Sequence, residues 1–238
     1  NYHGIIQQAH KNNKDWFDPN LKNVFKKFNF PFYFMDFETI TQGVPLIKNT
    51  QPYEALPFQW SVHKWESIDK EIDDGKSFLK FTDQDIERQF VETLLEAVGD
   101  NGTIFAHNAK WVEIRILNLL KNKDSCMDLA NKIDKIIDRV EDSLILSRMN
   151  FYSPKMNGEW KIKSIIKAIP DCPVSYDGQD NIGGGDEAQL AWFIYTDTKT
   201  NNDQRKEQIK NLLNYCAKDT LALYYLIKFL MNKSNEQS

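Results

Sequence analysis

The spacing of hydrophobic and polar residues predicts a chain that begins with strands and ends with helices. Short apolar or alternating runs, typical of strands, occupy residues 32–37, 56–65, 77–81 and 103–106. Helical spacing is found at about residues 20–28, 83–98, 108–120, 127–137, 161–168, 186–195 and 203–231, the last with one possible break. We therefore expect an α/β fold: a mixed central sheet flanked by helices.

The chain contains no internal repeat and no obvious linker, so we expect one main domain over residues 31–232. Residues 1–30 are read as a lead-in segment and residues 233–238 as a frayed polar tail. Loops are expected at residues 41–54 and 171–185, where glycine and proline interrupt the pattern. The first residue is Asn1 and not methionine, and we expect the sequence to be part of a longer chain.

Two carboxylates interrupt the most apolar of the predicted strands, at Asp36 and Glu38. Side chains two residues apart on a strand point to the same face. Two adjacent buried acids need a positive partner, and a divalent metal with oxygen ligands is the simplest one. The alternative is a strand that ends at the surface with two solvated acids.

A second pair of interest, Tyr215 and Asp219, lies near the end of the chain. The two residues are four apart, so on a helix they share one face, which is otherwise apolar. An aspartate on such a face needs a partner. Alternatively, Asp219 caps a helix that begins at Thr220.

Composition and charge limit the possible functions without deciding between them. The net charge of −4 gives no general basic surface for duplex binding, although bound metal ions would supply positive charge locally. Three cysteines without a CxxC pair predict reduced thiols in the core and a cytoplasmic location. No apolar run approaches the length of a membrane span, so we expect no membrane association.

A third stretch, His107-Asn108-Ala109-Lys110-Trp111-Val112-Glu113, lies at a predicted strand-to-helix junction. Together the three stretches resemble the motifs of the DEDD superfamily of 3′–5′ exonucleases, tyrosine subclass, which has a ribonuclease H-like fold. Those motifs are an Asp-x-Glu strand, a His-Asn-Ala-x-aromatic-Asp junction and a late Tyr-x-x-x-Asp helix. The segment Glu141-Asp142-Ser143-Leu144 is similar to a further segment of that superfamily.

A closer resemblance is to a bacterial domain of unknown function that bears this signature. It extends from about Trp16 to Leu230, through residues 31–39, 52–53, 56–63, 151–154 and 163–166 and the Tyr215 motif. In that family the domain usually lies at the C-terminal end of a longer nuclease-like protein. The resemblance therefore implies an N-terminal domain of the same chain as a partner.

The resemblance implies a metal-dependent exonuclease that releases nucleoside 5′-monophosphates from single-stranded DNA or RNA 3′ ends. Asp36, Glu38 and Asp219 would hold two Mg²⁺ or Mn²⁺ ions, and Tyr215 would orient the attacking water. Among other residues, Asn108 at the junction, Gln59 on the neighbouring strand and Lys163 on a short helix are candidate substrate contacts. His63 and His107 are expected to be ordinary half-buried histidines.

One position departs from the superfamily pattern, because Val112 stands where a metal-binding carboxylate is expected. Glu113 is adjacent, but one residue along a helix is a rotation of about 100°. Either Glu113 replaces the missing ligand through a shifted turn, or the site has lost one ligand. The second case supports an alternative function: a catalytically weakened module that binds nucleic acid ends or a partner domain. A glycosidase-type carboxyl pair is a third possibility, but that chemistry does not require the late Tyr-x-x-x-Asp helix.

Overall fold

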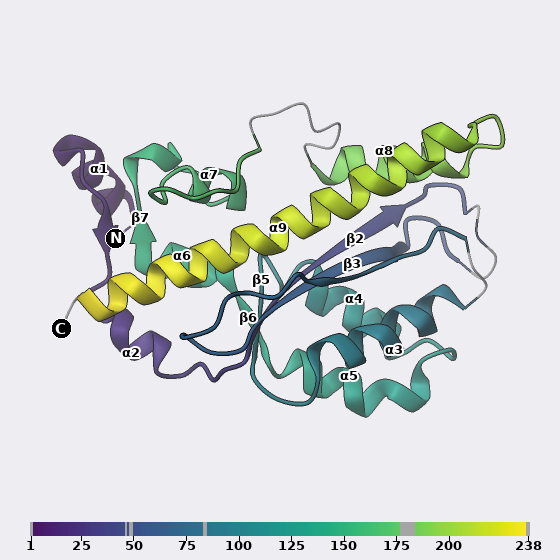
Figure 1. Cartoon of the computed structure of the whole chain (residues 1–238), viewed down its shortest axis with the longest axis horizontal. Helices are drawn as coiled ribbons and strands as arrows, with labels where there is room; N and C mark the ends of the chain where they lie inside the picture. Colours follow the sequence, from purple (N-terminus) through teal and green to yellow (C-terminus); the bar gives the residue numbers. More distant parts are fainter. Residues whose placement is uncertain (1, 46, 48–49, 83–84, 177–183, 237–238) are drawn as a thin grey trace.

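The computed structural model describes residues 2–45, 47, 50–82, 85–176 and 184–236, and a five-stranded mixed sheet lies at its centre (Figure 1). The strand order is β4 (Lys76–Leu79), β3 (Ala55–Trp65), β2 (Phe32–Thr41), β5 (Thr103–Ala106) and β6 (Val140–Asp142). Neighbouring strands are antiparallel from β4 to β2 and parallel from β2 to β6. The predicted α/β class and mixed sheet are confirmed.

β2 is covered on both faces. Its side chains point alternately to the two faces and so contribute to two separate hydrophobic cores. Met35 and Phe37 lie in the core shared with α3 (Ile86–Val98), α4 (Glu113–Leu120) and α5 (Ala130–Ile137). Phe32 and Phe34 lie in the core on the opposite face. Because side chains alternate along a strand, Asp36 and Glu38 lie on the same face as Phe34. The antiparallel register of β2 and β3 pairs Glu38 with Gln59 and Asp36 with Ser61.

The helix α9 (Asn202–Glu236) crosses that second face along the length of the molecule (Figure 1). It contains neither glycine nor proline, and the break expected within residues 203–231 does not occur. Thr220 fixes α9 over the sheet, because its Oγ1 lies 2.7 Å from His63 Nδ1 and 3.2 Å from Ser61 Oγ. The same layer contains α2 (Leu21–Phe25), α6 (Ser143–Asn150), α7 (Ile162–Ile166) and α8 (Gly185–Thr196).

The N-terminal segment is a structural part of the molecule and more than a lead-in. It forms α1 (Tyr2–Asn12) and β1 (Trp16–Phe17), and β1 pairs with β7 (Phe151–Tyr152). His10 Nε2 lies 2.8 Å from the Tyr152 hydroxyl, which ties α1 to β7. Two 3₁₀ helices complete the described elements, η1 (Met127–Leu129) and η2 (Pro154–Met156).

The element boundaries differ from the sequence-based expectations in four places. The helix expected from residue 108 begins only at Glu113, because Asn108 has a left-handed backbone (φ 62°) that no α-helix accepts. β6 and α6 were not predicted, since three strand residues give too short a pattern. Residues 233–236 continue α9 and do not fray. Residues 83–84 of the expected third helix and 177–183 of the expected irregular loop lie outside the described residues.

Within the described part of the chain, none of the helices combines the length and the apolar character needed to cross a bilayer.

Candidate active site

Three potential metal ligands meet where α9 crosses β2. A carboxylate oxygen of Asp36, one of Glu38 and the sulfur of Cys216 all lie within 4.8 Å of one another. Glu38 is buried and Asp36 is partly exposed. The Cys216 thiol, from α9, donates to Asp36 Oδ2 at 3.3 Å. The two-residue period of β2 and the packing of α9 together create this cluster.

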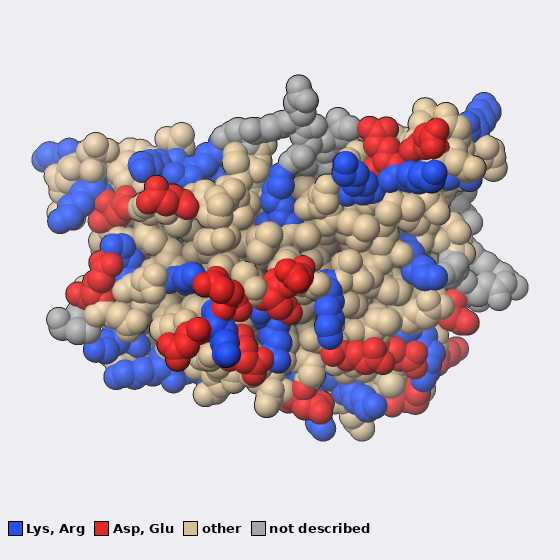
Figure 2. Space-filling model, in the orientation of Figure 1, with Lys and Arg blue, Asp and Glu red and all other residues tan. Residues whose placement is uncertain are grey.

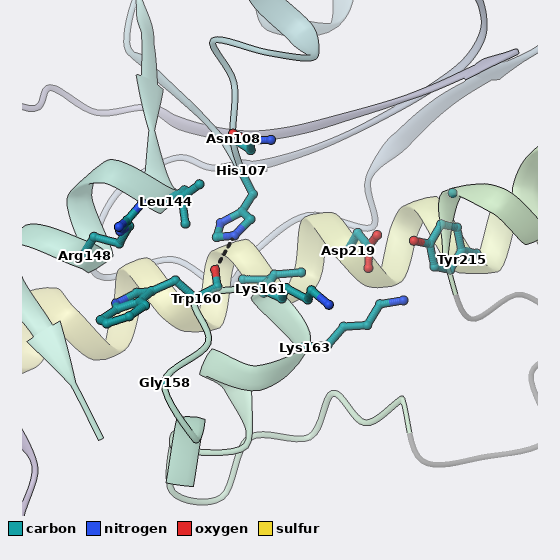
Figure 3. Close-up of a pocket in the computed structure, with 13 residues that line it drawn as sticks. His107, Asn108, Leu144, Arg148, Gly158, Trp160, Lys161, Lys163, Tyr215 and Asp219 are labelled. Carbon is teal, nitrogen blue, oxygen red and sulfur yellow. Dashed lines mark hydrogen bonds between the residues drawn. The ribbon is translucent and has the colours of Figure 1, made fainter. Parts of the chain in front are cut away.

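Asp219 lies on α9 one turn after Tyr215 (Figure 3). Its carboxylate accepts hydrogen bonds from the hydroxyls of Tyr176 and Tyr215. The negative charge of Asp219 raises the pKa of both Asp36 and Glu38. The structure therefore brings together Asp36, Glu38, Tyr215 and Asp219, the residues that the sequence motifs singled out. Asp219 lies within α9 and does not cap a helix beginning at Thr220.

Glu113, the first residue of α4, supplies a fourth carboxylate. Its side chain is 1% exposed, and its Oε2 has no hydrogen-bond partner among the described residues. The Asp36 charge raises the pKa of Glu113, and the Glu113 charge raises that of Glu38, so Glu113 faces the acidic pair. The charge of Glu113 thus acts on the acidic pair, while the ligand atoms within 4.8 Å of one another come from Asp36, Glu38 and Cys216.

The turn before α4 explains this arrangement. Asn108 takes a left-handed conformation, and the Asp142 carboxylate accepts the backbone N–H groups of Asn108 (3.0 Å) and Lys110 (3.4 Å). Val112 precedes the helix with φ −116° and ψ −83°, outside helical geometry. A rotation of 100° per residue counted from Asn108 therefore does not apply, since helical geometry begins only at Glu113.

Burial is the main cause of the raised carboxylate pKa values in this cluster. It raises the pKa of Asp36, Glu38, Glu113 and Asp219, and repulsion from neighbouring carboxylates adds to the effect at the first three. Lys163 partly offsets this, because its positive charge lowers the pKa of Asp36, Glu38 and Asp219. A divalent cation bound among these oxygens would reverse the balance.

The other polar groups of the cluster stay neutral near pH 7. Burial and the adjacent carboxylates raise the pKa of the Tyr215 and Tyr176 hydroxyls and of the Cys216 thiol. All three groups therefore keep their hydrogens and can donate hydrogen bonds to the carboxylates around them.

A cleft of about 880 Å³ opens beside the cluster (Figure 3). Asp219 and Tyr215 line one end, and Arg148 and Trp160 line the other. Lys163 lies between them, with its ammonium 5.1 Å from the centre of the Tyr215 ring.

Comparison with known proteins places the chain in a family. A family described as "Domain of unknown function (DUF2779)" matches residues 33–161, just over half of the chain. The chain belongs to the DUF2779 family. No curated protein and no solved structure matches the chain.

The DUF2779 match includes three of the four clustered carboxylates, those of Asp36, Glu38 and Glu113. It also includes Asn108, which lines the cleft as expected for a substrate contact. The site also depends on residues beyond the match: Lys163, Tyr215 and Asp219, contributed by α7 and α9.

Gln59, the remaining residue expected to contact substrate, is not among the described residues that line the cleft. Its side chain is fully buried between β3 and α9, and its Nε2 donates to the Leu212 carbonyl at 2.8 Å. His107 is likewise structural. Its Nε2 donates to the Trp160 carbonyl (2.8 Å), Ser143 Oγ lies 2.9 Å from its Nδ1, and burial lowers its pKa.

Sequence reasoning missed two members of the site. Cys216 was interpreted only as a core residue, although on α9 it lies three residues before Asp219, a spacing that shares a helix face. Tyr176 lies in the segment read as irregular, and no pattern in that segment predicts its contact with Asp219.

Proposed function

We propose that this DUF2779 domain is a metal-dependent 3′–5′ exonuclease that hydrolyses single-stranded nucleic acid. One observation carries the proposal. Buried or half-buried carboxylates from three elements, β2, α4 and α9, act on one another electrostatically beside an open cleft, with Tyr215 one turn from Asp219.

The sheet supports the ribonuclease H-like fold that the motifs imply. Three antiparallel strands, β4, β3 and β2, are followed by two strands, β5 and β6, parallel to β2. The acidic pair lies on β2, the central strand. The motifs also follow one another along the chain in the order that the superfamily has: an acidic strand (β2), a strand-to-helix junction (β5 to α4) and a late helix (α9).

The donor set fits Mg²⁺ or Mn²⁺. Asp36, Glu38, Glu113 and Asp219 would hold the ions, because hard divalent cations prefer carboxylate oxygens. The unpartnered Glu113 Oε2 is the observation that most favours a bound cation, since a buried carboxylate oxygen without a partner is costly. When bound, a pair of such ions activates a water molecule and stabilises the attacking and leaving oxygens of an in-line displacement.

The protein side chains have separate roles in this proposal. Tyr215 keeps its proton, so its hydroxyl orients the attacking water and does not act as a base. Cys216 donates its thiol hydrogen to Asp36 Oδ2 and so fixes the orientation of that carboxylate. The Lys163 ammonium, half-buried above the rings of Tyr176 and Tyr215, is suited to bind a phosphate oxygen.

A strand-shortening assay tests the proposal. With Mn²⁺, a 5′-labelled single strand should be shortened one nucleotide at a time from its 3′ end. Asp36→Asn and Asp219→Asn should abolish shortening. The same assay with a DNA strand and with an RNA strand would show which sugar the site accepts.

The opposite result would favour the alternative function. A wild-type protein inert with both Mn²⁺ and Mg²⁺, which binds the strand as tightly as Asp36→Asn does, would be a binding module. Val112 supports that alternative, whereas the burial of Glu113 and its charge interaction with Asp36 support the enzyme.

A further inference from the structure

We propose that the end of the cleft remote from the acidic cluster is a phosphate-binding subsite formed by Arg148 and Lys161. It would hold the backbone of a single-stranded nucleic acid upstream of the bond that is cut. The inference rests on the proposed function for the direction of the strand, but not for the existence of the subsite.

Arg148 carries a fixed positive charge that no acid neutralises within the part of the chain that the structure describes. It is an exposed residue of α6, and its guanidinium carbon lies 5.6 Å from the ring centres of both Tyr2 and Trp160. These two contacts restrict the side chain, which also interacts with the Tyr2 hydroxyl. A guanidinium has five N–H groups, so donors are left for a phosphate. Among the described residues, none forms an ion pair with Arg148. The group is therefore positioned and still able to bind an anion.

Lys161 and Lys163 extend this positive charge toward the acidic cluster. Lys161 is exposed, lines the cleft and lies between Trp160 and Lys163 in the chain (Figure 3). Lys163 reaches the Tyr215 end. Three cations thus follow the cleft from Arg148 to the carboxylate of Asp219, which lies at its opposite end.

The wall that carries Arg148 is rigid. The Trp160 ring packs edge-on against Tyr2 at 5.7 Å and tilted against Tyr152 at 5.3 Å. The Trp160 carbonyl accepts a hydrogen bond from His107 Nε2, a residue of the turn before α4. Helix α1 therefore supports the Trp160 end of the cleft through Tyr2, although α1 is remote in sequence from every acidic residue of the site.

A ligand with several negative charges in a row fits this arrangement best. Basic and acidic side chains are interspersed over the face that carries α9 (Figure 2), and the net charge is −4, so overall attraction to nucleic acid is weak. The row of cations in the cleft is local. The volume of about 880 Å³ lies near the upper end of the range for small-molecule pockets, roughly 300–1,000 Å³. With the 3′ end at Asp219, the preceding phosphates would lie along Lys163, Lys161 and Arg148.

Binding of a 5′-fluorescein-labelled single strand in EDTA tests the subsite separately from catalysis. The double variant Arg148→Ala/Lys161→Ala should bind DNA and RNA strands at least about tenfold more weakly at low salt. The slope of log affinity against log salt should fall by roughly 1.4, about 0.7 for each lost phosphate contact. Arg148→Lys/Lys161→Arg, which keeps both charges, should retain most of the slope.

A matched control removes two lysines from the opposite face of the sheet. Lys132 and Lys135 are exposed on α5, which packs on the other core, so Lys132→Ala/Lys135→Ala should bind as the wild type does. Unchanged affinity and salt slope in Arg148→Ala/Lys161→Ala would overturn the subsite, even if the protein shortens strands. A wild type that does not bind the strand would overturn it too. Loss of binding in this variant, together with a wild type inert in the strand-shortening assay, would support the subsite and reject the exonuclease.

Discussion

At the scale of single residues, the site is defined by carboxylates in positions that weaken the metal-free fold. Glu113 is almost fully buried, has an unpartnered oxygen and faces Asp36, so its charged form is disfavoured. Such an arrangement has no benefit for packing alone. It is explained if the native protein binds cations at this point, since stability is often sacrificed where function requires it.

Replacing Glu113 by glutamine should therefore have opposite effects on stability and function. Glu113→Gln removes a buried charge and keeps the side-chain volume, so the melting temperature in EDTA should rise. Calorimetric Mn²⁺ titration should show weaker binding, and strand shortening should slow by about 10²-fold or more. Val112→Asp is the control, and it should change Mn²⁺ affinity little. Tighter Mn²⁺ binding in Val112→Asp with no effect in Glu113→Gln would instead place the ligand at position 112.

Tyr215→Phe should reduce the rate without reducing metal affinity. The change removes a hydroxyl that keeps its proton and leaves every carboxylate in place. Positioning groups of this kind contribute about 10²–10⁴-fold, and we expect a loss in that range in kcat. Mn²⁺ affinity measured by calorimetry should stay within about twofold of the wild type. An equal loss of Mn²⁺ binding would show that the hydroxyl acts through Asp219 as a structural support.

The raised carboxylate pKa values predict a pH dependence of stability for the metal-free protein. Between the ordinary pKa of an acid, about 4, and its raised folded value, the folded state holds more protons than the unfolded state. The free energy of unfolding should therefore fall as the pH rises through this window. Urea denaturation in EDTA at a series of pH values measures this free energy. In Glu113→Gln the free energy of unfolding should fall less steeply with pH than in the wild type. A slope identical to that of the wild type would remove Glu113 from the coupled cluster.

At the scale of elements, the turn between β5 and α4 decides which residue faces the acidic strand. Asp142 accepts hydrogen bonds from Asn108 and Lys110 and also caps α6 by accepting from Leu144 N at 2.9 Å. One carboxylate thus fixes two element boundaries. Because Glu113 is the first residue after this turn, its orientation depends on Asp142.

Asp142→Ala should destabilise the protein by about 1–3 kcal/mol, since it removes a helix cap and leaves backbone N–H groups without their acceptor. Asp142→Asn keeps an oxygen acceptor and should cost less. Chemical denaturation would measure both variants. A nuclease rate that falls in Asp142→Ala and is restored in Asp142→Asn would link the turn to the placement of Glu113. Equal stability of Asp142→Ala and the wild type would contradict this account of the turn.

The same elements show how far sequence alone could predict the site. The period of two in β2 and the spacing of four in α9 placed Asp36 with Glu38 and Tyr215 with Asp219 on shared faces, because both periods are properties of the backbone. The resemblance to the exonuclease motifs then joined the two pairs. The orientation of Glu113 was not predictable, since it depends on the left-handed Asn108. Tyr176 contacts Asp219, and Arg148 lines the cleft, through tertiary packing that no local pattern encodes.

At the scale of the whole molecule, α9 joins parts of the chain that are far apart in sequence. It contributes to the core that contains Phe34 and to a smaller cluster around Phe58, and it carries Cys216 and Asp219 to the acidic pair of β2. Three hydrogen bonds fix the position of α9 relative to β3: Thr220 with His63, Thr220 with Ser61, and Gln59 with the Leu212 carbonyl. The α/β class and the sheet were predictable from alternation, but the two cores and the role of α1 were not. They depend on how helices distribute between the faces.

The central claim is that the carboxylates of β2, α4 and α9 form one metal centre. Anomalous diffraction from a crystal soaked in Mn²⁺ tests it most directly. We predict two peaks roughly 3.5–4 Å apart, bound by Asp36, Glu38, Glu113 and Asp219, both absent from crystals of Asp36→Asn. The absence of peaks at this cluster in the wild type, or peaks only at other surface acids, would contradict the claim.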